Sequence, residues 1–197
     1  MILVSIIVAY LLGSVSFSYL FGRMLKGIDI RKHGSGNAGA TNTLRVLGKG
    51  PAISVLALDV VKGIVAVWLP VWLGQDAEWV RVSCAIAVIV GHNWPVFFGF
   101  KGGKGIATTI GVMATLAFLP ALIAGIIALG SIFVTRFVSL GSLLFTALLP
   151  LFIWLFGRPE EIFWLSLLIA VFAFVRHRTN IVKLVKGKEN KLGSKKA

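Results

Sequence analysis

The chain has 197 residues, of which 57% are apolar and only 14% are charged, whereas a typical soluble domain has about 25% charged residues. It carries 20 Lys and Arg against 7 Asp and Glu, for a net charge of +13, and its mean hydropathy is +0.93. These values exclude a disordered chain, a basic DNA-binding domain and an ordinary soluble enzyme, and they favour an integral membrane protein with no nucleic-acid partner. The single cysteine, Cys84, lies in an apolar run, so the sequence offers neither a disulfide framework nor a cysteine metal site. We expect one membrane-embedded domain over residues 1–197.

Apolar runs that approach the roughly 20 residues needed to cross a membrane follow one another along the chain. They cover residues 1–22, 51–74, 79–99, 105–135, 139–157 and 160–176. The first run lacks the basic start and the small-residue cleavage site of a signal peptide, so we expect an uncleaved helix. As one helix, the run 105–135 would measure about 46 Å, well beyond the roughly 30 Å of the hydrocarbon core. Pro120 near its middle allows a turn between two short helices.

The distribution of basic residues favours seven spans over six, because cytoplasmic loops carry an excess of Lys and Arg. With seven spans and an outer N-terminus, 17 of the 20 basic residues lie inside, and only Arg81 and Arg158 lie outside. With six spans, the basic tail over residues 183–197 would change sides. The sequence therefore predicts an all-α bundle of seven transmembrane helices with a cytoplasmic C-terminus. The positive tail suits attraction to anionic lipid headgroups.

The first inner loop, residues 33–50, is rich in small and polar residues. Glycine allows close approach of the backbone to a ligand and permits positive φ, so successive amides can converge on an anion. Ser35, Asn37, Thr41 and Asn42 add neutral polar groups, and Arg45 adds a guanidinium that matches phosphate oxygens. A flexible linker is the plainer interpretation of such a stretch, but a linker does not require this combination. We predict a phosphate-binding loop.

The second inner loop lies within residues 91–109 and places a glycine-rich turn directly before a helix, whose free amides and dipole favour an anion. The turn resembles a P-loop, but Gly105 follows Lys104 where Ser or Thr would be needed, and the leading glycine is one residue too close. We therefore predict a phosphate cradle without a metal or cofactor. Its residues are Gly102, Gly103, Lys104, Gly105, Ile106, Ala107 and Thr108.

Other polar side chains lie within the spans or at their inner ends, and each allows two interpretations. If the last helix continues, His177 and Asn180 share one face and are candidate ligands, while Arg176 and Arg178 beside them are typical of side chains that reach the membrane surface. Ser142 either contacts a ligand or hydrogen-bonds its own helix.

Asp59 and Lys62 are three residues apart within a span, hence neighbours on one helix face. A lone charge there is expensive, so an ion pair that locks helix packing is the first interpretation and direct chemistry the second. For His92, a structural hydrogen bond to a loop carbonyl competes with proton transfer.

Together these segments resemble the bacterial acyl-phosphate:glycerol-3-phosphate acyltransferase family over essentially the whole chain. The resemblance rests on residues 34–50, 58–63, 91–108 and 176–180. It implies transfer of a fatty acyl group from acyl phosphate to the 1-hydroxyl of sn-glycerol 3-phosphate, giving lysophosphatidic acid in the first step of phospholipid synthesis. It also implies a location in the bacterial inner membrane, among membrane lipid, with the active site on the cytoplasmic face. A monomer is the expected state.

The residues agree with direct attack by the substrate hydroxyl, because the sequence contains no His-x4-Asp motif, no Gly-x-Ser-x-Gly elbow and no basic neighbour that would activate Cys84. No covalent acyl-enzyme is expected. Guided by the resemblance, we assign glycerol 3-phosphate to Ser35, Arg45, Lys104, His177 and Asn180 as catalytic residues. The acyl phosphate is assigned to the Gly102–Thr108 turn with Thr41, Asn42 and Ser142, and Asn37 is a further substrate-binding residue. His177 and a substrate phosphate oxygen remain alternative proton acceptors.

A transporter of organic phosphates is the competing class of function. Its site should lie near the membrane midplane, often between repeated halves. Here the cationic groups gather on one face, only Asp59 and Lys62 stand in the interior, and we find no repeat. A lipid-phosphate phosphatase would need acidic or nucleophilic residues that these loops lack.

Overall fold

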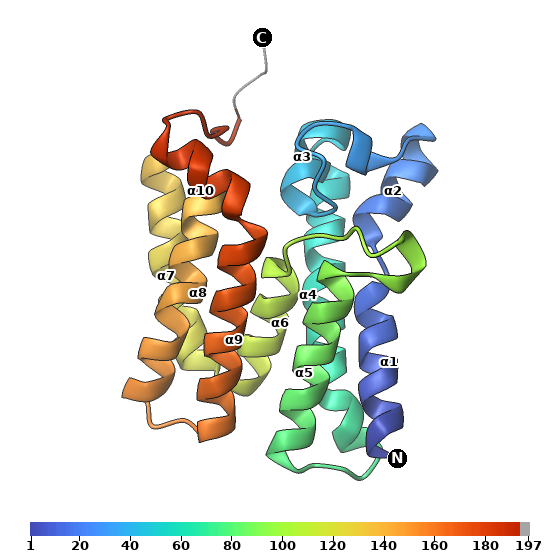
Figure 1. The fold of residues 1–197 in the computed structure, drawn as a ribbon, viewed down its shortest axis with the longest axis vertical. Coiled ribbons are helices and arrows are strands. Elements are labelled where there is room, and N and C mark those ends of the chain that lie inside the picture. The colour runs from blue at the N-terminus through green and yellow to red at the C-terminus, as the bar shows by residue number, and fades with distance from the viewer. Residues whose placement is uncertain (194–197) are drawn as a thin grey trace. The chain divides into compact units, whose positions relative to one another are not determined.

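A computed structural model describes residues 1–193, and every regular element in that range is a helix, as predicted (Figure 1). Five segments are long and apolar enough to cross a membrane: Ile2–Lys26, Lys49–Trp72, Glu78–Phe98, Phe118–Thr135 and Val138–Leu155. The bent pair Glu160–Arg176 and Arg178–Val185 makes a sixth if its two helices count as one span, and Ile106–Leu116 is a shorter apolar helix. The count of seven spans and the sides of the two termini stay predictions. Lys195 and Lys196 of the predicted basic tail lie outside the described residues.

The chain divides into two compact units, Met1–Leu116 and Ala117–Ala197, and the expectation of a single domain stays a prediction. The first unit contains α1 (Ile2–Ser14), α2 (Phe17–Lys26), the 3-10 helix η1 (Ile30–Lys32), α3 (Ala40–Leu47), α4 (Lys49–Trp72), α5 (Glu78–Asn93), η2 (Val96–Phe98) and α6 (Ile106–Leu116). Within it α1 packs along α5, α4 contacts both α5 and α6, and α3 packs on α4.

Glycines let the helices of the first unit approach closely. A Cβ on Gly91 of α5 would lie 2.2 Å from the carbonyl oxygen of Tyr10 in α1, and a Cβ on Gly111 of α6 would lie 2.0 Å from that of Val60 in α4. Small residues at such crossings are typical of membrane helices, which associate by packing rather than by exclusion of water. The position of α6 is therefore set by direct backbone contact with α4.

The expected first span, residues 1–22, is present as Ile2–Lys26, and its helix is interrupted between α1 and α2. The backbone carbonyls of Gly13 and Val15 at the break accept hydrogen bonds from the Lys62 ammonium, at 3.1 and 3.0 Å. A freed carbonyl in a membrane helix needs such a partner. The break is therefore stabilised by the side chain of Lys62, which lies 47 residues after Val15 in the sequence.

The second unit contains α7 (Phe118–Thr135), α8 (Val138–Leu155), α9 (Glu160–Arg176) and α10 (Arg178–Val185). Here α8 packs against both α7 and α9, and α10 contacts α8 and α9. The predicted division of residues 105–135 into two helices is confirmed, but the boundary is at Ala117 rather than at Pro120. Pro120 lies in the first turn of α7, where a missing N–H leaves no hydrogen bond unmade.

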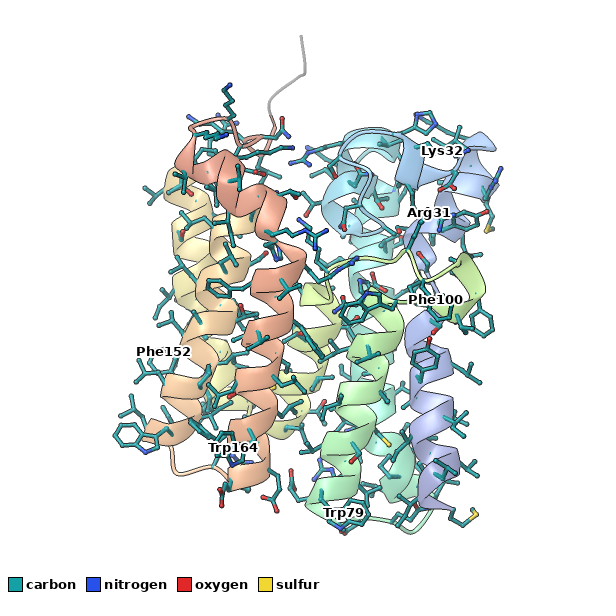
Figure 2. The ribbon with its side chains drawn as sticks, viewed as in Figure 1. Arg31, Lys32, Trp79, Phe100, Phe152 and Trp164 are labelled. Carbon is teal, nitrogen blue, oxygen red and sulfur yellow. The ribbon has the colours of Figure 1, made fainter. Side chains whose placement is uncertain are left out.

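The two ends of the first unit differ in character. Lys32 and Arg31 lie toward one end, Trp79 lies at the other, and Phe100 lies between them (Figure 2). A tryptophan near a helix end is typical of a membrane–water interface. The glycine-rich loop before α3 lies toward the end that carries Arg31 and Lys32, and the segment that leads into α6 lies nearer the middle of the unit (Figure 1).

Candidate functional site

The first glycine-rich segment is a loop that the side chain of Asn42 holds in place. Asn42 Oδ1 accepts a hydrogen bond from the backbone N–H of Ser35 at 2.8 Å, and its Nδ2 donates to the carbonyls of Ile30 and His33 at 3.1 and 3.0 Å. Gly34 has φ +62°, and a Cβ there would lie 2.2 Å from Asn42 Oδ1. Asn42 therefore shapes the loop that presents the exposed Ser35.

The expected loop over residues 33–50 contains one further helix. α3 begins directly after the glycine-rich stretch and carries Thr41, Asn42 and Arg45. Arg45 is exposed in its last turn, while Asn42, one turn earlier in the helix, is buried. The side chain predicted to bind phosphate is thus held by a helix rather than by a mobile loop.

The second glycine-rich segment is a turn that leads into the N-terminus of α6. The backbone N–H of Gly103 donates to the carbonyl of His92 at 3.1 Å, and Gly105, with φ +80°, directs the chain into the helix. The amides of a first helical turn carry partial positive charge and attract anions. Lys104 lies half-buried within the turn. This geometry suits the predicted phosphate cradle.

Polar atoms without a hydrogen-bond partner lie beside this turn. Among the described residues, the hydroxyl of Thr108 and both amide atoms of Asn93 are buried and unpartnered. A Cβ on Gly105 would lie 3.0 Å from Asn93 Oδ1, so this amide is next to the turn. A buried polar group without a partner costs about 1–3 kcal/mol. Such groups gather where a polar ligand or a bound water would satisfy them.

The two glycine-rich segments meet. A Cβ on Gly103 would lie 2.6 Å from the carbonyl oxygen of Ala38, so the turn before α6 touches the loop before α3. The predicted phosphate-binding segments, more than sixty residues apart in the sequence, are thus neighbours within one unit. Backbone donors from both are available to one highly charged ligand or to two adjacent ones.

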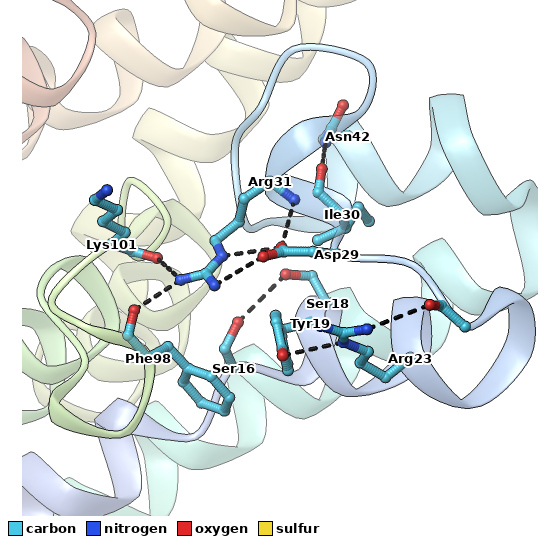
Figure 3. Close-up of polar contacts among 11 residues, drawn as sticks. Ser16, Ser18, Tyr19, Arg23, Asp29, Ile30, Arg31, Asn42, Phe98 and Lys101 are labelled. Carbon is cyan, nitrogen blue, oxygen red and sulfur yellow. Dashed lines mark hydrogen bonds and ion pairs between the residues drawn. The ribbon is translucent and has the colours of Figure 1, made fainter.

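Arg31 ties the first loop to the second (Figure 3). Its guanidinium binds both carboxylate oxygens of Asp29, at 3.0 and 2.9 Å, and donates to the carbonyls of Phe98 and Lys101, at 2.7 and 3.4 Å. It also lies over the ring of Tyr19, 5.0 Å from its centroid. The hydrogen bonds from Arg31 lower the pKa of Asp29 from 3.8 to about 2. This contact was not predicted from the sequence.

The predicted ion pair between Asp59 and Lys62 is confirmed, with 2.8 Å between Lys62 Nζ and Asp59 Oδ1. Both side chains are buried within the first unit. His92 lies on the other side of the carboxylate, with Nδ1 3.5 Å from the same Asp59 oxygen. The Asp59 carboxylate is therefore a partner of this ring nitrogen, and the expected hydrogen bond of His92 to a loop carbonyl stays a prediction.

In the second unit, His177 and Asn180 lie on either side of a bend. α9 and α10 meet at His177 with an angle of 64°, so the condition that the helix continues is not met. His177 is buried, and its Nδ1 is 2.8 Å from the carbonyl of Ala173. Asn180 Nδ2 donates to Glu189 Oε1 at 2.9 Å. The predicted role of these two residues in binding glycerol 3-phosphate stays a prediction.

Ser142 is buried in α8 and donates its hydroxyl to the carbonyl of Val138, one turn earlier, at 2.9 Å. This is the second of the two interpretations of that residue. Its predicted contact with acyl phosphate would require that hydroxyl to exchange one acceptor for another.

The predicted site residues thus fall into two groups. Those in the first unit gather at the two touching segments: Ser35, Asn37, Thr41, Asn42, Arg45, Gly102, Gly103, Lys104, Gly105, Ile106, Ala107 and Thr108. Those in the second unit are Ser142, His177 and Asn180.

Sequence reasoning missed Arg31 and Asn93. The close spacing of Asp29 and Arg31 was a usable signal for the role of Arg31. The position of Asn93 next to His92 was only a weak signal for Asn93. Within residues 1–193, no three His, Cys, Asp or Glu side chains come together as a metal site would require.

Comparison with known proteins gives a consistent result. A family model described as glycerol-3-phosphate acyltransferase matches residues 3–187. A glycerol-3-phosphate acyltransferase from Halalkalibacterium halodurans is 55% identical, over 97% of this chain and 95% of the relative. One from Shouchella clausii is 54% identical, over 100% and 98%.

Two crystal structures share the fold. Both are of PlsY, an integral membrane glycerol 3-phosphate acyltransferase. Its glycerol 3-phosphate form has a TM-score of 0.92 at 40% identity and covers 98% of this chain and 96% of that one. Its lysophosphatidic acid form has a TM-score of 0.89 at 39% identity, with 98% and 95% covered. The likeness extends over both glycine-rich segments and the helices that hold them.

Proposed function

The chain belongs to the glycerol-3-phosphate acyltransferase family, and from this premise we propose that it transfers a fatty acyl group from acyl phosphate to the 1-hydroxyl of sn-glycerol 3-phosphate. The products are 1-acyl-glycerol 3-phosphate, which is lysophosphatidic acid, and inorganic phosphate. Crystal forms of a relative with glycerol 3-phosphate and with lysophosphatidic acid support the acceptor and the product. The choice of acyl phosphate as donor is the more specific part of the proposal.

One observation carries the proposal from the residues themselves: the contact between Ala38 and Gly103 that joins the two glycine-rich segments. Both proposed substrates carry a phosphate. A pair of adjoining cradles, one before α3 and one before α6, supplies backbone amides for two phosphates side by side. Arg45 and Lys104 add the positive charge that such ligands need.

In the proposed mechanism the 1-hydroxyl oxygen attacks the carbonyl carbon of the acyl phosphate. The new ester C–O bond forms, the bond from that carbon to the phosphate oxygen breaks, and the phosphate leaves with the bonding electron pair. The hydroxyl proton passes either to a phosphate oxygen or to His177. Because the mixed anhydride is already activated, the protein contributes orientation and charge stabilisation rather than a nucleophile.

The residue roles follow this division. We assign Ser35, Arg45 and Lys104 to glycerol 3-phosphate, together with His177 and Asn180, and the Gly102–Thr108 turn to acyl phosphate, with Asn37 and Thr41 as further substrate contacts. For Asn42, all three hydrogen bonds go to the loop backbone, so we assign it to holding the loop. Ser142, bonded to its own helix, is assigned a supporting position in α8.

The proposed setting is the bacterial inner membrane, with seven spans, an outer N-terminus and the basic end of the first unit at the cytoplasmic surface. Basic residues are frequent in and beside the glycine-rich segments. They include Arg31, Lys32, Arg45, Lys101 and Lys104. Cytoplasmic loops are enriched in such residues. The acyl chain of the donor would lie in lipid or among apolar helices while its phosphate reaches these loops.

The decisive experiment incubates the purified protein with acyl phosphate and glycerol 3-phosphate, in the presence of a chelator, and measures lysophosphatidic acid and released phosphate. We expect both products in equal amounts. Parallel reactions with acyl-CoA and with acyl-acyl carrier protein should give neither. Product from those donors but not from acyl phosphate would refute the proposed donor. Uptake of labelled glycerol 3-phosphate into sealed vesicles without any acyl product would instead indicate transport.

A further inference from the structure

Asp59, Lys62 and His92 form a buried polar chain in the first unit that is distinct from the residues assigned to the substrates. Their exposed fractions are 2%, 2% and 7%. A buried charge is costly unless it is paired and hydrogen-bonded. The side chains of Lys62 and His92 both contact the same atom, Oδ1 of Asp59.

Lys62 is the first neighbour of Asp59, and its contacts explain why a positively charged side chain is buried here. Its ammonium lies 2.8 Å from Asp59 Oδ1 and donates to the carbonyls of Gly13 and Val15. It also lies 5.6 Å from the ring centroid of Phe17, the first residue of α2. The lysine thereby stabilises the helix break and balances the carboxylate. A pair that only locked packing would be complete at this point.

On the other side, the chain continues to His92 and from there to the glycine-rich turn. The carboxylate lies beside His92 Nδ1, which favours the imidazole tautomer with its hydrogen on that nitrogen. The opposite ring atom, Nε2, lies against the turn: a Cβ on Gly103 would be 2.1 Å from it. The backbone of Gly103 also donates to the His92 carbonyl. His92 thus contacts Gly103 through both its ring and its main chain.

We propose that Asp59 is a positioning residue for acyl transfer: it orients His92, and the His92 ring sets the position of the Gly102–Gly105 turn that binds the acyl phosphate. This proposal rests on the proposed function. Asp59 lies in the middle of α4 and does not itself contact the turn in any interaction described above. Its effect on the reaction passes through a neighbouring side chain, as in metal sites where outer partners orient ligating histidines.

The test separates this role from a purely structural one. Asp59→Asn alone would leave the Lys62 ammonium buried beside a neutral group. The main variant is therefore the double substitution Asp59→Leu with Lys62→Met, since a buried ion pair replaced by apolar residues of similar volume is often tolerated. We expect this variant to fold with a lower melting temperature in detergent, because the carbonyls of Gly13 and Val15 lose the Lys62 ammonium as their hydrogen-bond donor. We expect its KM for acyl phosphate to rise about tenfold or more, because small displacements of binding groups are costly, with little change in KM for glycerol 3-phosphate.

A second variant, His92→Phe, keeps a ring of similar size without the 3.5 Å contact between Nδ1 and Asp59, and it should raise the same KM by a similar factor. A protein that carries both changes should have a KM for acyl phosphate no higher than that of either variant alone, because both changes remove the same contact between Asp59 and His92. Glu78→Gln is the matched control. It breaks an ion pair of the same spacing, with Arg81 on α5, that involves none of these residues, and it should leave both KM values unchanged.

The proposal is overturned if His92→Phe has the KM of the unchanged protein for acyl phosphate, whether or not the double variant folds. It is also overturned if the double variant folds and both KM values are unaltered, or if both rise equally. Failure of the proposed function has a different signature, because the unchanged protein would then form no lysophosphatidic acid from acyl phosphate.

Discussion

The crossing of α4 and α6 makes Gly111→Ala a sharp test of how the phosphate cradle is positioned. A Cβ at Gly111 would lie 2.0 Å from the carbonyl oxygen of Val60, whereas ordinary contact begins at 3.4 Å. The shortfall is about 1.4 Å, and because the atom it meets is helix backbone, it cannot be relieved by a change of rotamer. α6 must therefore move away from α4.

The consequence reaches the turn because Gly111 lies only five residues after Ile106, where α6 begins. At about 1.5 Å per residue, the helix start is roughly 7.5 Å away along the axis, so a rigid shift of α6 displaces the amides that we propose bind the acyl phosphate. A misplacement of about 1 Å can lower a rate by about a hundredfold. Overpacking of this kind costs about 1–3 kcal/mol of stability. We expect a folded protein whose kcat/KM is lower by at least about tenfold.

The assay is the initial rate of lysophosphatidic acid formation, measured beside the melting temperature of each variant in detergent. Gly63→Ala provides an intermediate case, since its Cβ would lie 2.4 Å from the carbonyl oxygen of Thr108. Gly125→Ala in α7 is the control, because nothing lies within 4 Å of its Cβ. The expected order of loss is Gly111, then Gly63, with Gly125 unchanged. A Gly111→Ala protein with kcat/KM within twofold of the original would refute the argument that α6 fixes the turn.

Other expectations concern charge and metal. The pKa of Asp29 is held at about 2 by Arg31. Because it lies below the unfolded value, its contribution to stability is present above about pH 4 and lost as the pH falls toward 2. Thermal unfolding from pH 5 to pH 2 should therefore be less pH-dependent in Asp29→Asn, and equal slopes would contradict the Arg31 contact. Arg45→Ala and Lys104→Ala should each raise KM for glycerol 3-phosphate or lower the rate by about tenfold or more, since a hydrogen bond to a charged group contributes about 1.5–3 kcal/mol. Unchanged kinetics in both would remove these residues from the site. Activity should persist in excess chelator, and a loss restored by added Mg²⁺ would contradict a metal-free reaction.

Much of the helical framework and one buried contact could be predicted from the sequence because their signals are local. Long apolar runs mark the helices, and the spacing of Asp59 and Lys62 on one helix face predicts their ion pair. The division of residues 105–135 followed from the length of the run compared with the membrane. Each of these inferences needs only neighbouring residues and a known period.

The contacts that were missed depend on residues far apart in the chain. Arg31 donates to the carbonyls of Phe98 and Lys101, 67 and 70 residues later. Every residue has a backbone carbonyl, so the sequence does not indicate which ones Arg31 binds. The break after Ser14 contains neither glycine nor proline, and it exists because Lys62 accommodates the freed carbonyls. No pattern within residues 1–22 reports that partner.

The placement of the two charges on one helix also bears on how the protein enters its membrane. A lysine or an aspartate at the centre of an inserting helix costs about 2.5–3.5 kcal/mol on insertion scales. Asp59 and Lys62 stand three residues apart within α4, so they neutralise each other as soon as that segment coils. During synthesis, α4 can therefore pass from the translocon into lipid as a nearly neutral rod, before α1 offers its carbonyls to the ammonium.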